Sequence, residues 1–224
     1  MINKNHVILF SISDKKKNSN FILNIKMTNI DQTFWQDRWE NGQTGWDVGY
    51  AAPALVEYMK QYPNKNAKIL IPGCGNAYEA AALFDLGFTN IHLLDIAPYA
   101  VENLKEKFKA IPQIHIWCGD FFHHEESYDL IIEQTFFCAL DPLLRPDYVK
   151  SCYKLLKPGG KIIGLLFNIH FEKEGPPFGG TLLEYRELFS KNFTIQKMES
   201  CYNSIPPRAG NELFIVIVKK TTDL

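Results

Sequence analysis

The sequence predicts an α/β fold: a doubly wound, mostly parallel seven-stranded sheet with an antiparallel C-terminal strand pair and a helical N-terminal segment. Three observations predict it. From residue 68 onward, short apolar runs alternate with longer helical patterns, which is typical of βαβ units. The last two strand-like runs are joined by a short loop, so they should pair antiparallel. The chain has 224 residues, 46% of them hydrophobic, which is enough for one domain with a sizeable core.

The parallel strands are expected where runs of about four to seven residues are β-branched-rich and bounded by glycine, proline or acidic residues. These runs are 68–71, 91–96, 114–119, 128–134 and 161–167. Helical patterns separate them at 77–87, 98–110 and 145–160, and the last ends in a Pro-Gly-Gly stop signal. The antiparallel pair is expected at 192–202 and 212–220, joined by "NSIPPRAGN" with no helix between them.

The N-terminal residues match a signal peptide poorly, because the charged "DKKK" follows the apolar run and no small-residue cleavage site comes after it. We therefore expect residues 1–26 to be a flexible or misannotated extension. A single domain is expected over 27–224, with its core from residue 67.

Composition excludes several functional classes. The formal net charge is −1, so nothing global indicates a nucleic-acid partner. Apolar runs stay below the roughly 18–20 residues of a membrane span. The five cysteines form no C-x-x-C pair, which indicates reduced thiols in the cytoplasm rather than disulfides or zinc. Adjacent His123 and His124 point apart in a loop, so no metal site is expected. We expect a cytoplasmic monomer acting on a small molecule.

A glycine-rich turn follows the first strand, in "IPGCGNAYEAA". Gly73 and Gly75 permit a sharp turn and a close approach of a ligand to the main chain. Asn76 is expected to be the N-cap of the next helix, with Glu79 completing a capping-box-like start. Asp95 ends the second strand, where its carboxylate can accept both ribose hydroxyls of a nucleoside.

The residue at position 78 separates two cofactor classes. A dinucleotide fingerprint requires glycine there, whereas this chain has Tyr78, whose ring would obstruct a pyrophosphate on the helix N-terminus. S-adenosylmethionine has no pyrophosphate and makes no such demand. The third strand ends in "CGDFF", where Asp120 can accept the adenine amino group and Phe121 can close one face of the ring. Ligands of open α/β sheets bind at this carboxyl edge.

These residues resemble a class I S-adenosylmethionine-dependent methyltransferase with its Rossmann-like fold. Within that superfamily the chain is similar to the thiopurine S-methyltransferase-like family, above all to its branch of halide and thiol methyltransferases. The resemblance covers residues 34 to about 212 and rests on "FWQDRWENGQTGWD", "IPGCGNAYE", "LLDIA", "GDFF", "YDLIIEQTFFCALDP", "EGPPF" and "SIPPRAGNE".

The resemblance implies that residues 27–66 form a lid whose tryptophans lie against the methionine end of the cofactor. Trp35 and Trp39 are four apart, hence on one face of a helix. The residues implied to contact the cofactor are Trp35, Trp39, Trp46, Gly73, Gly75, Asp95, Ile96, Asp120, Phe121 and Gln134. Two departures matter. The thiopurine branch has arginine in place of Gln134, which weakens a thiopurine assignment, and the plant branch has tyrosine in place of Phe167.

The expected reaction is methyl transfer to a small soft nucleophile: a thiol, hydrosulfide, thiocyanate or halide. A sulfonium and an anion give two neutral products, so a dry pocket favours the step and an ionised nucleophile requires no general base. No catalytic residue is therefore assigned. Candidates for the substrate pocket are the aromatic residues and one arginine that the pattern places around it: Trp46, Tyr50, Phe137, Phe167, Phe178 and Arg208.

Alternatives remain open. The same fold could methylate a small oxygen or nitrogen nucleophile, or bind S-adenosylmethionine without catalysis. A nicotinamide dehydrogenase is disfavoured by Tyr78 and by the antiparallel strand pair. "QTFF" after the fourth strand replaces the Asn/Asp-Pro-Pro-aromatic turn that amine-methylating nucleic-acid enzymes share, so base methylation is disfavoured too.

Overall fold

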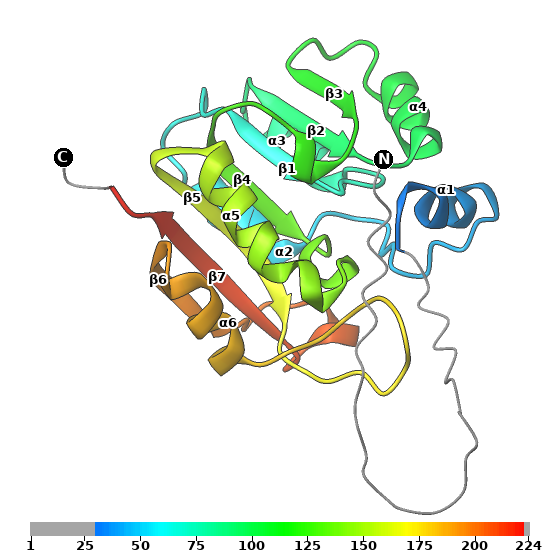
Figure 1. Cartoon of the computed structure of the whole chain (residues 1–224). Helices are drawn as coiled ribbons and strands as arrows, with labels where there is room; N and C mark the ends of the chain where they lie inside the picture. Colours follow the sequence, from blue (N-terminus) through cyan, green and yellow to red (C-terminus); the bar gives the residue numbers. More distant parts are fainter. Residues whose placement is uncertain (1–29, 222–224) are drawn as a thin grey trace, which may run out of the picture.

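One seven-stranded sheet organises the computed structural model, which describes residues 30–221 (Figure 1). The strand order is β3-β2-β1-β4-β5-β7-β6. The first five strands pair parallel, and β7 lies antiparallel between β5 and β6. The predicted fold class is therefore confirmed. The strands are β1 Ile69–Pro72, β2 Ile91–Asp95, β3 Ile114–Cys118, β4 Tyr128–Gln134, β5 Leu156–Phe167, β6 Phe193–Ser200 and β7 Glu212–Lys219.

Helices cover both faces of this sheet (Figure 1). Successive strand residues point to opposite faces, so Ile69 and Ile71 pack with α2 and α3, whereas Leu70 packs with α5 and α6. The helix α1 packs against α4 beside the β1–β2–β3 half of the sheet. The helices are α1 Gln32–Glu40, α2 Pro53–Lys60, α3 Tyr78–Asp85, α4 Pro98–Lys107, α5 Arg145–Leu155 and α6 Leu182–Ser190.

Several boundaries differ from the prediction. The helices α2 and α6 were not expected, although α6 begins with a capping box between Thr181 and Glu184. The strand β5 begins at Leu156, before the Pro-Gly-Gly turn rather than after it. The expectation for residues 1–26 lies outside the described residues. Within residues 30–221, no helix combines the length and apolar character that crossing a bilayer demands.

Candidate functional site

The loop after β1 forms the floor of the site. Gly73, Gly75 and Ala77 have φ angles of 54°, 52° and 49°, so three alternate residues adopt the left-handed conformation. A Cβ atom on Gly73 would lie 2.3 Å from Cδ2 of Phe136, and one on Gly75 would lie 3.3 Å from the Trp39 ring. Glycine is therefore required at 73 by space as well as by backbone conformation.

The expected capping of α3 is wrong. Its N-cap is Ala77, which makes no side-chain hydrogen bond. Asn76 instead donates from Nδ2 to Asp47, and the Tyr78 hydroxyl donates to the same carboxylate at 3.2 Å. Glu79 accepts the Ala52 N–H at 2.9 Å. These side chains form hydrogen bonds with the N-terminal segment, so they attach that segment to the glycine loop instead of capping α3.

Asp95 lies at the carboxyl end of β2, next to the glycine loop. Its carboxylate accepts the Gly75 N–H at 3.0 Å and, through the other oxygen, the Ala97 N–H at 2.9 Å. Burial raises the pKa of Asp95, while these hydrogen bonds oppose the rise. Each oxygen keeps a second lone pair, so a role toward ribose hydroxyls is compatible with these bonds and stays a prediction, as does the contact of Ile96 with the cofactor.

The tryptophans of the N-terminal segment gather over the glycine loop. Trp46 makes edge contacts with Trp35 and Trp39, with ring centroids 5.4 and 5.8 Å apart. Together with Ala97 and Ala100 they form a small cluster separate from the two main cores. Trp39 is buried (9% exposed). This segment therefore covers the loop, and its predicted lid function toward the cofactor stays a prediction.

A hollow of about 450 Å³, including its open mouth, lies between this segment and the strand ends. It brings together seven of the residues proposed from the sequence: Trp39, Trp46, Tyr50, Gly73, Gly75, Gln134 and Arg208. Its lining also includes residues that the sequence did not single out for the site, among them Asp47, Val48, Cys74 and Thr135.

A second hollow of about 230 Å³ adjoins the first. The two share Val48, Gln134 and Arg208. Gln134 Oε1 and Ser204 Oγ are buried here without a hydrogen-bond partner among the described residues. Such groups are costly to leave unsatisfied, so they are candidates for contact with a ligand.

Arg208 links the C-terminal loop to the N-terminal segment. Its guanidinium donates to the Trp46 carbonyl at 3.4 Å and pairs with Glu212 at 3.3 Å. It also lies over the Phe167 ring, 5.3 Å from the centroid. Glu212 is 3% exposed, so much of the cation's charge is already compensated inside the protein.

Other proposed residues lie apart from the hollows. Phe121 is 4% exposed and stacks on Tyr148, and Phe137 is 1% exposed in the same core, so neither ring offers a face to a ligand. Asp120 caps the 3₁₀ turn Phe121–His123 and pairs with His123 at 2.9 Å. Phe178 donates its N–H to the Cys138 carbonyl at 2.6 Å. A core role for the two phenylalanine rings could not be read from "DFF" and "TFF", because it depends on α5.

Sequence reasoning did not find Glu133. This fully buried residue of β4 accepts the N–H groups of Phe136 and Phe137, both at 2.9 Å, and the Tyr148 hydroxyl at 2.8 Å. Burial raises its pKa to about 7. An acidic residue within the apolar run "YDLIIEQ" was the available signal. Within residues 30–221, no group of three or more His, Cys, Asp or Glu side chains is arranged to hold a metal ion.

Comparison with known proteins gives consistent results. A family model described as Thiopurine S-methyltransferase (TPMT) matches residues 30–219. The chain is 35% identical to the probable thiol methyltransferase 2 of Arabidopsis thaliana over 184 residues, covering 80% of this chain and 81% of that one. It is 32% identical to thiocyanate methyltransferase 1 of Brassica oleracea over 194 residues, covering 82% and 83%.

Solved structures share the fold. The 1,6-didemethyltoxoflavin-N1-methyltransferase of Burkholderia thailandensis, solved with S-adenosylhomocysteine, superposes with a TM-score of 0.66 at 15% identity, covering 85% of this chain and 87% of that one. A TehB-like S-adenosylmethionine-dependent methyltransferase from Corynebacterium glutamicum gives a TM-score of 0.59 at 17% identity, covering 85% and 98%. At these identities the likeness shows the fold alone.

Proposed function

The chain belongs to the thiopurine S-methyltransferase family, and on that premise we propose that its acceptor is a small, soft, anionic nucleophile: a thiol, hydrosulfide, thiocyanate or halide. It is an S-adenosylmethionine-dependent methyltransferase that acts on sulfur nucleophiles. When bound, the cofactor supplies an electrophilic methyl group on a sulfonium. The two relatives reported above are named for a thiol and for thiocyanate, which supports this acceptor class.

The observation that carries the proposal is the chemistry of the larger hollow. Its described lining contains neither histidine nor lysine, and its two carboxylates accept hydrogen bonds from other parts of the chain: Asp47 from Asn76 and Tyr78, and Glu79 from the Ala52 N–H. Cys74 is half-buried, and the loss of water around its thiol raises its pKa well above the usual value, so it is a protonated thiol at neutral pH. A lining of this kind suits an acceptor that arrives already ionised, rather than an alcohol or amine that must lose a proton.

The residues around the hollow have complementary roles in this proposal. The Trp39 and Trp46 rings exclude water and offer π-faces to a sulfonium, each interaction contributing about 0.5–2 kcal/mol. The Gly73–Gly75 backbone, Asp95 and Asp120 bind the remainder of the cofactor, with the Gln134 amide toward its methionine end. Arg208 orients the anion. Because the two reacting charges disappear as the methyl group is transferred, excluding water favours the step.

The acceptor proposal is tested by headspace gas chromatography. Purified protein and S-adenosylmethionine are incubated separately with bisulfide, thiocyanate, iodide and thiophenol, with phenol and aniline as oxygen and nitrogen controls. Methylated products from the soft nucleophiles, and none from phenol or aniline, are expected. Faster methylation of phenol or aniline would overturn the acceptor class, and S-adenosylhomocysteine binding with no product from any compound would favour a non-catalytic protein.

We also propose that residues 30–66, the described part of the expected segment 27–66, act as a lid over the cofactor. A matched pair of variants tests this: Trp39→Ala in the N-terminal segment and Trp117→Ala on the edge strand β3, where the ring is 45% exposed. Trp39→Ala should weaken S-adenosylhomocysteine binding about tenfold or more, since a buried aromatic contact is lost. Trp117→Ala should leave the affinity unchanged. An unchanged affinity in Trp39→Ala, with a lower melting temperature, would make this ring core alone.

The setting of the reaction completes the proposal. All five cysteines are free thiols, and three of them are buried, which supports a reducing compartment such as the cytoplasm. We propose a monomer that acts on small molecules and not on nucleic acid. Sedimentation velocity of the purified protein tests the first of these statements, and a stable dimer would contradict it.

A further inference from the structure

We propose that Glu133 is a positioning residue for the reaction: its carboxylate holds the loop after β4 in the conformation that presents Gln134 and Thr135 to the hollow. This inference rests on the proposed function, because the loop acquires a catalytic purpose from the cofactor beside it. Glu133 itself lines neither hollow, so it can affect the reaction only through the loop that it holds.

The backbone conformation of the loop after β4 indicates that the Glu133 side chain holds the loop in place. Thr135 has φ 61°, a left-handed conformation that a β-branched residue adopts at a cost and that must be stabilised by surrounding contacts. Directly after it, the N–H groups of Phe136 and Phe137 both point back to Glu133 Oε1 at 2.9 Å. One carboxylate oxygen therefore fixes the chain on the far side of the strained residue.

The surroundings of Glu133 are built to accept its carboxylate. Its second oxygen accepts the Tyr148 hydroxyl at 2.8 Å, so the side chain receives three hydrogen bonds while fully buried. Gly164 on the adjacent strand β5 leaves the room: a Cβ atom there would lie 2.4 Å from the Glu133 Cβ. A buried carboxylate without a role in holding the loop would cost stability that an apolar residue would not.

The loop held in this way forms part of the site. Gln134 and Thr135 line the larger hollow, and Gln134 also lines the smaller one. The Phe136 ring covers Gly73 of the glycine loop, so a shift of Phe136 would be felt at the cofactor backbone contacts. Ionised Glu133 accepts all three donors, whereas protonated Glu133 brings a fourth donor into the same space and weakens the arrangement.

The titration of this group can be separated from that of its neighbours. Tyr148 and Cys152 face it from α5, and Cys138 faces it from the turn Phe137–Ala139. Burial raises the pKa of each of these three groups, to about 12 for Cys138, so they stay neutral below pH 8.5. Glu133, with its pKa near 7, changes charge within that range.

The test is the affinity for S-adenosylhomocysteine, measured by calorimetry from pH 5.5 to pH 8 in three proteins. The wild type should bind tighter as pH rises through about 7. Glu133→Gln, which imitates the protonated side chain, should bind about tenfold more weakly at pH 8 than the wild type and show no such inflection. Tyr148→Phe removes a hydrogen bond that favours the carboxylate, so its inflection should remain and move to higher pH.

Because the ligand contains no methyl acceptor, this measurement is independent of which nucleophile is used. An inflection that persists unchanged in Glu133→Gln would belong to another group and would overturn the proposal. Equal pH-independent losses in both variants would make Glu133 a structural residue alone. Failure of all three proteins, the wild type included, to bind S-adenosylhomocysteine would contradict the function itself and not the role of Glu133. Melting temperatures of the three proteins check that each is folded.

Discussion

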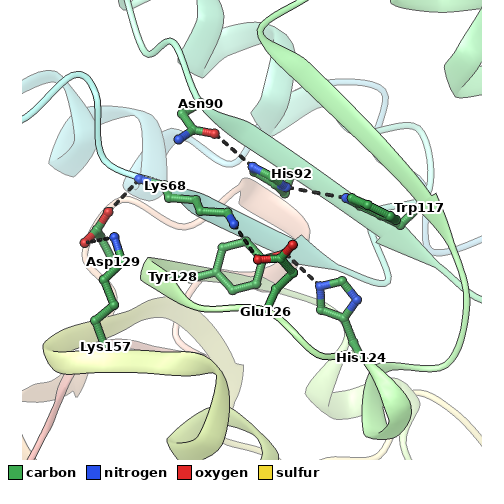
Figure 2. Close-up of polar contacts among 9 residues, drawn as sticks. All are labelled: Lys68, Asn90, His92, Trp117, His124, Glu126, Tyr128, Asp129 and Lys157. Carbon is green, nitrogen blue, oxygen red and sulfur yellow. Dashed lines mark hydrogen bonds and ion pairs between the residues drawn. The ribbon is translucent and has the colours of Figure 1, made fainter.

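Polar side chains at the amino ends of the strands form hydrogen bonds and ion pairs with one another. At the carboxyl ends, several polar side chains face the two hollows instead. The amino-end cluster takes residues from β2, β3, β4 and β5, from the positions just before β1 and β2, and from the β3–β4 connection (Figure 2). Trp117 reaches it from the carboxyl half of β3. His92 is fixed between the Asn90 side chain, 2.8 Å from Nε2, and the Trp117 indole, 3.4 Å from Nδ1. Asp129 accepts the Lys68 N–H and the Lys157 ammonium, both at 2.8 Å.

The carboxyl-end cluster is arranged differently. Asp95, Glu133 and Asp47 bind backbone or side-chain donors that shape loops, while Gln134 Oε1 and Ser204 Oγ keep their hydrogen-bonding capacity unused within the described chain. The same chemical groups therefore serve two purposes. Polar groups that make their hydrogen bonds within the chain stabilise the sheet, whereas groups without such a partner remain available to a ligand. Unsatisfied polar atoms and strained backbone occur together at the candidate site.

The largest difference is expected from a pair of glycine variants. Gly73→Ala places a methyl group against Phe136 in a left-handed backbone and should weaken S-adenosylhomocysteine binding about a hundredfold or more. Gly87→Ala, in the turn before β2, has φ 85° and open space around it, so it should cost about 1 kcal/mol of stability and leave binding unchanged. Comparable binding losses in both variants would mean that the carboxyl-end loop has no special role.

A pair of aspartate variants should give the next largest effect. Asp95→Asn should weaken S-adenosylhomocysteine binding about tenfold, because a charged acceptor for hydroxyl groups becomes a neutral amide. Asp129→Asn should leave binding unchanged and lower the free energy of unfolding instead. Burial would raise the pKa of Asp129, but hydrogen bonds and charges of Lys157 and Lys68 outweigh it and lower the pKa. The stability that Asp129 contributes is thus present at neutral pH and lost as pH falls through its lowered pKa.

Acid denaturation sharpens the comparison through His92. Burial, followed by the charges of His115 and Lys68, lowers its pKa to about 4. The unfolded chain takes up this proton from about pH 6.5 downward, so the wild type should lose up to about 3 kcal/mol of stability between pH 7 and pH 4 from this residue. His92→Gln should be less stable at pH 7 but show a shallower loss on acidification. The free energy of unfolding is measured by urea titration at each pH. If it depended on pH in the same way in both proteins, His92 would not be buried in its neutral form.

The smallest effect should come from hydroxyl deletions. Ser204→Ala removes an unsatisfied hydroxyl group, so stability should stay within about 0.5 kcal/mol of the wild type. Its acceptor KM should rise about threefold if the smaller hollow takes part in binding. Tyr128→Phe, at the amino end, removes a bond of 2.7 Å to His124 and should cost about 1 kcal/mol without changing KM. A stability loss in Ser204→Ala matching that of Tyr128→Phe would indicate a partner for Ser204.

The sheet could be predicted from the sequence because its strands are encoded by local apolar runs; β4 at 128–134 has the expected bounds. The capping of α3 could not, since Asn76 and Glu79 are engaged by Asp47 and Ala52, 29 and 27 positions away. Such long-range partners leave no local pattern.

The candidate site was foreseen in outline for a similar reason. Glycines and acidic residues at strand ends fall on one edge of a parallel sheet whatever the loops do. The packing of distant helices decides which aromatic rings face that edge. Phe121 and Phe137 pack against Tyr148 of α5 and are therefore part of the core. Glu133 was missed because its role depends on the left-handed turn at Thr135.

The central claim is that the carboxyl ends of the strands, and not the amino ends, bind the cofactor. A crystal structure of the protein with S-adenosylhomocysteine tests it most directly. We expect the ribose on Asp95, the adenine beside Asp120 and the homocysteine between the Gly73–Gly75 loop and Trp39. Density for the ligand beside Lys68 and Asp129 at the amino ends, or an empty carboxyl edge at saturating ligand, would contradict it.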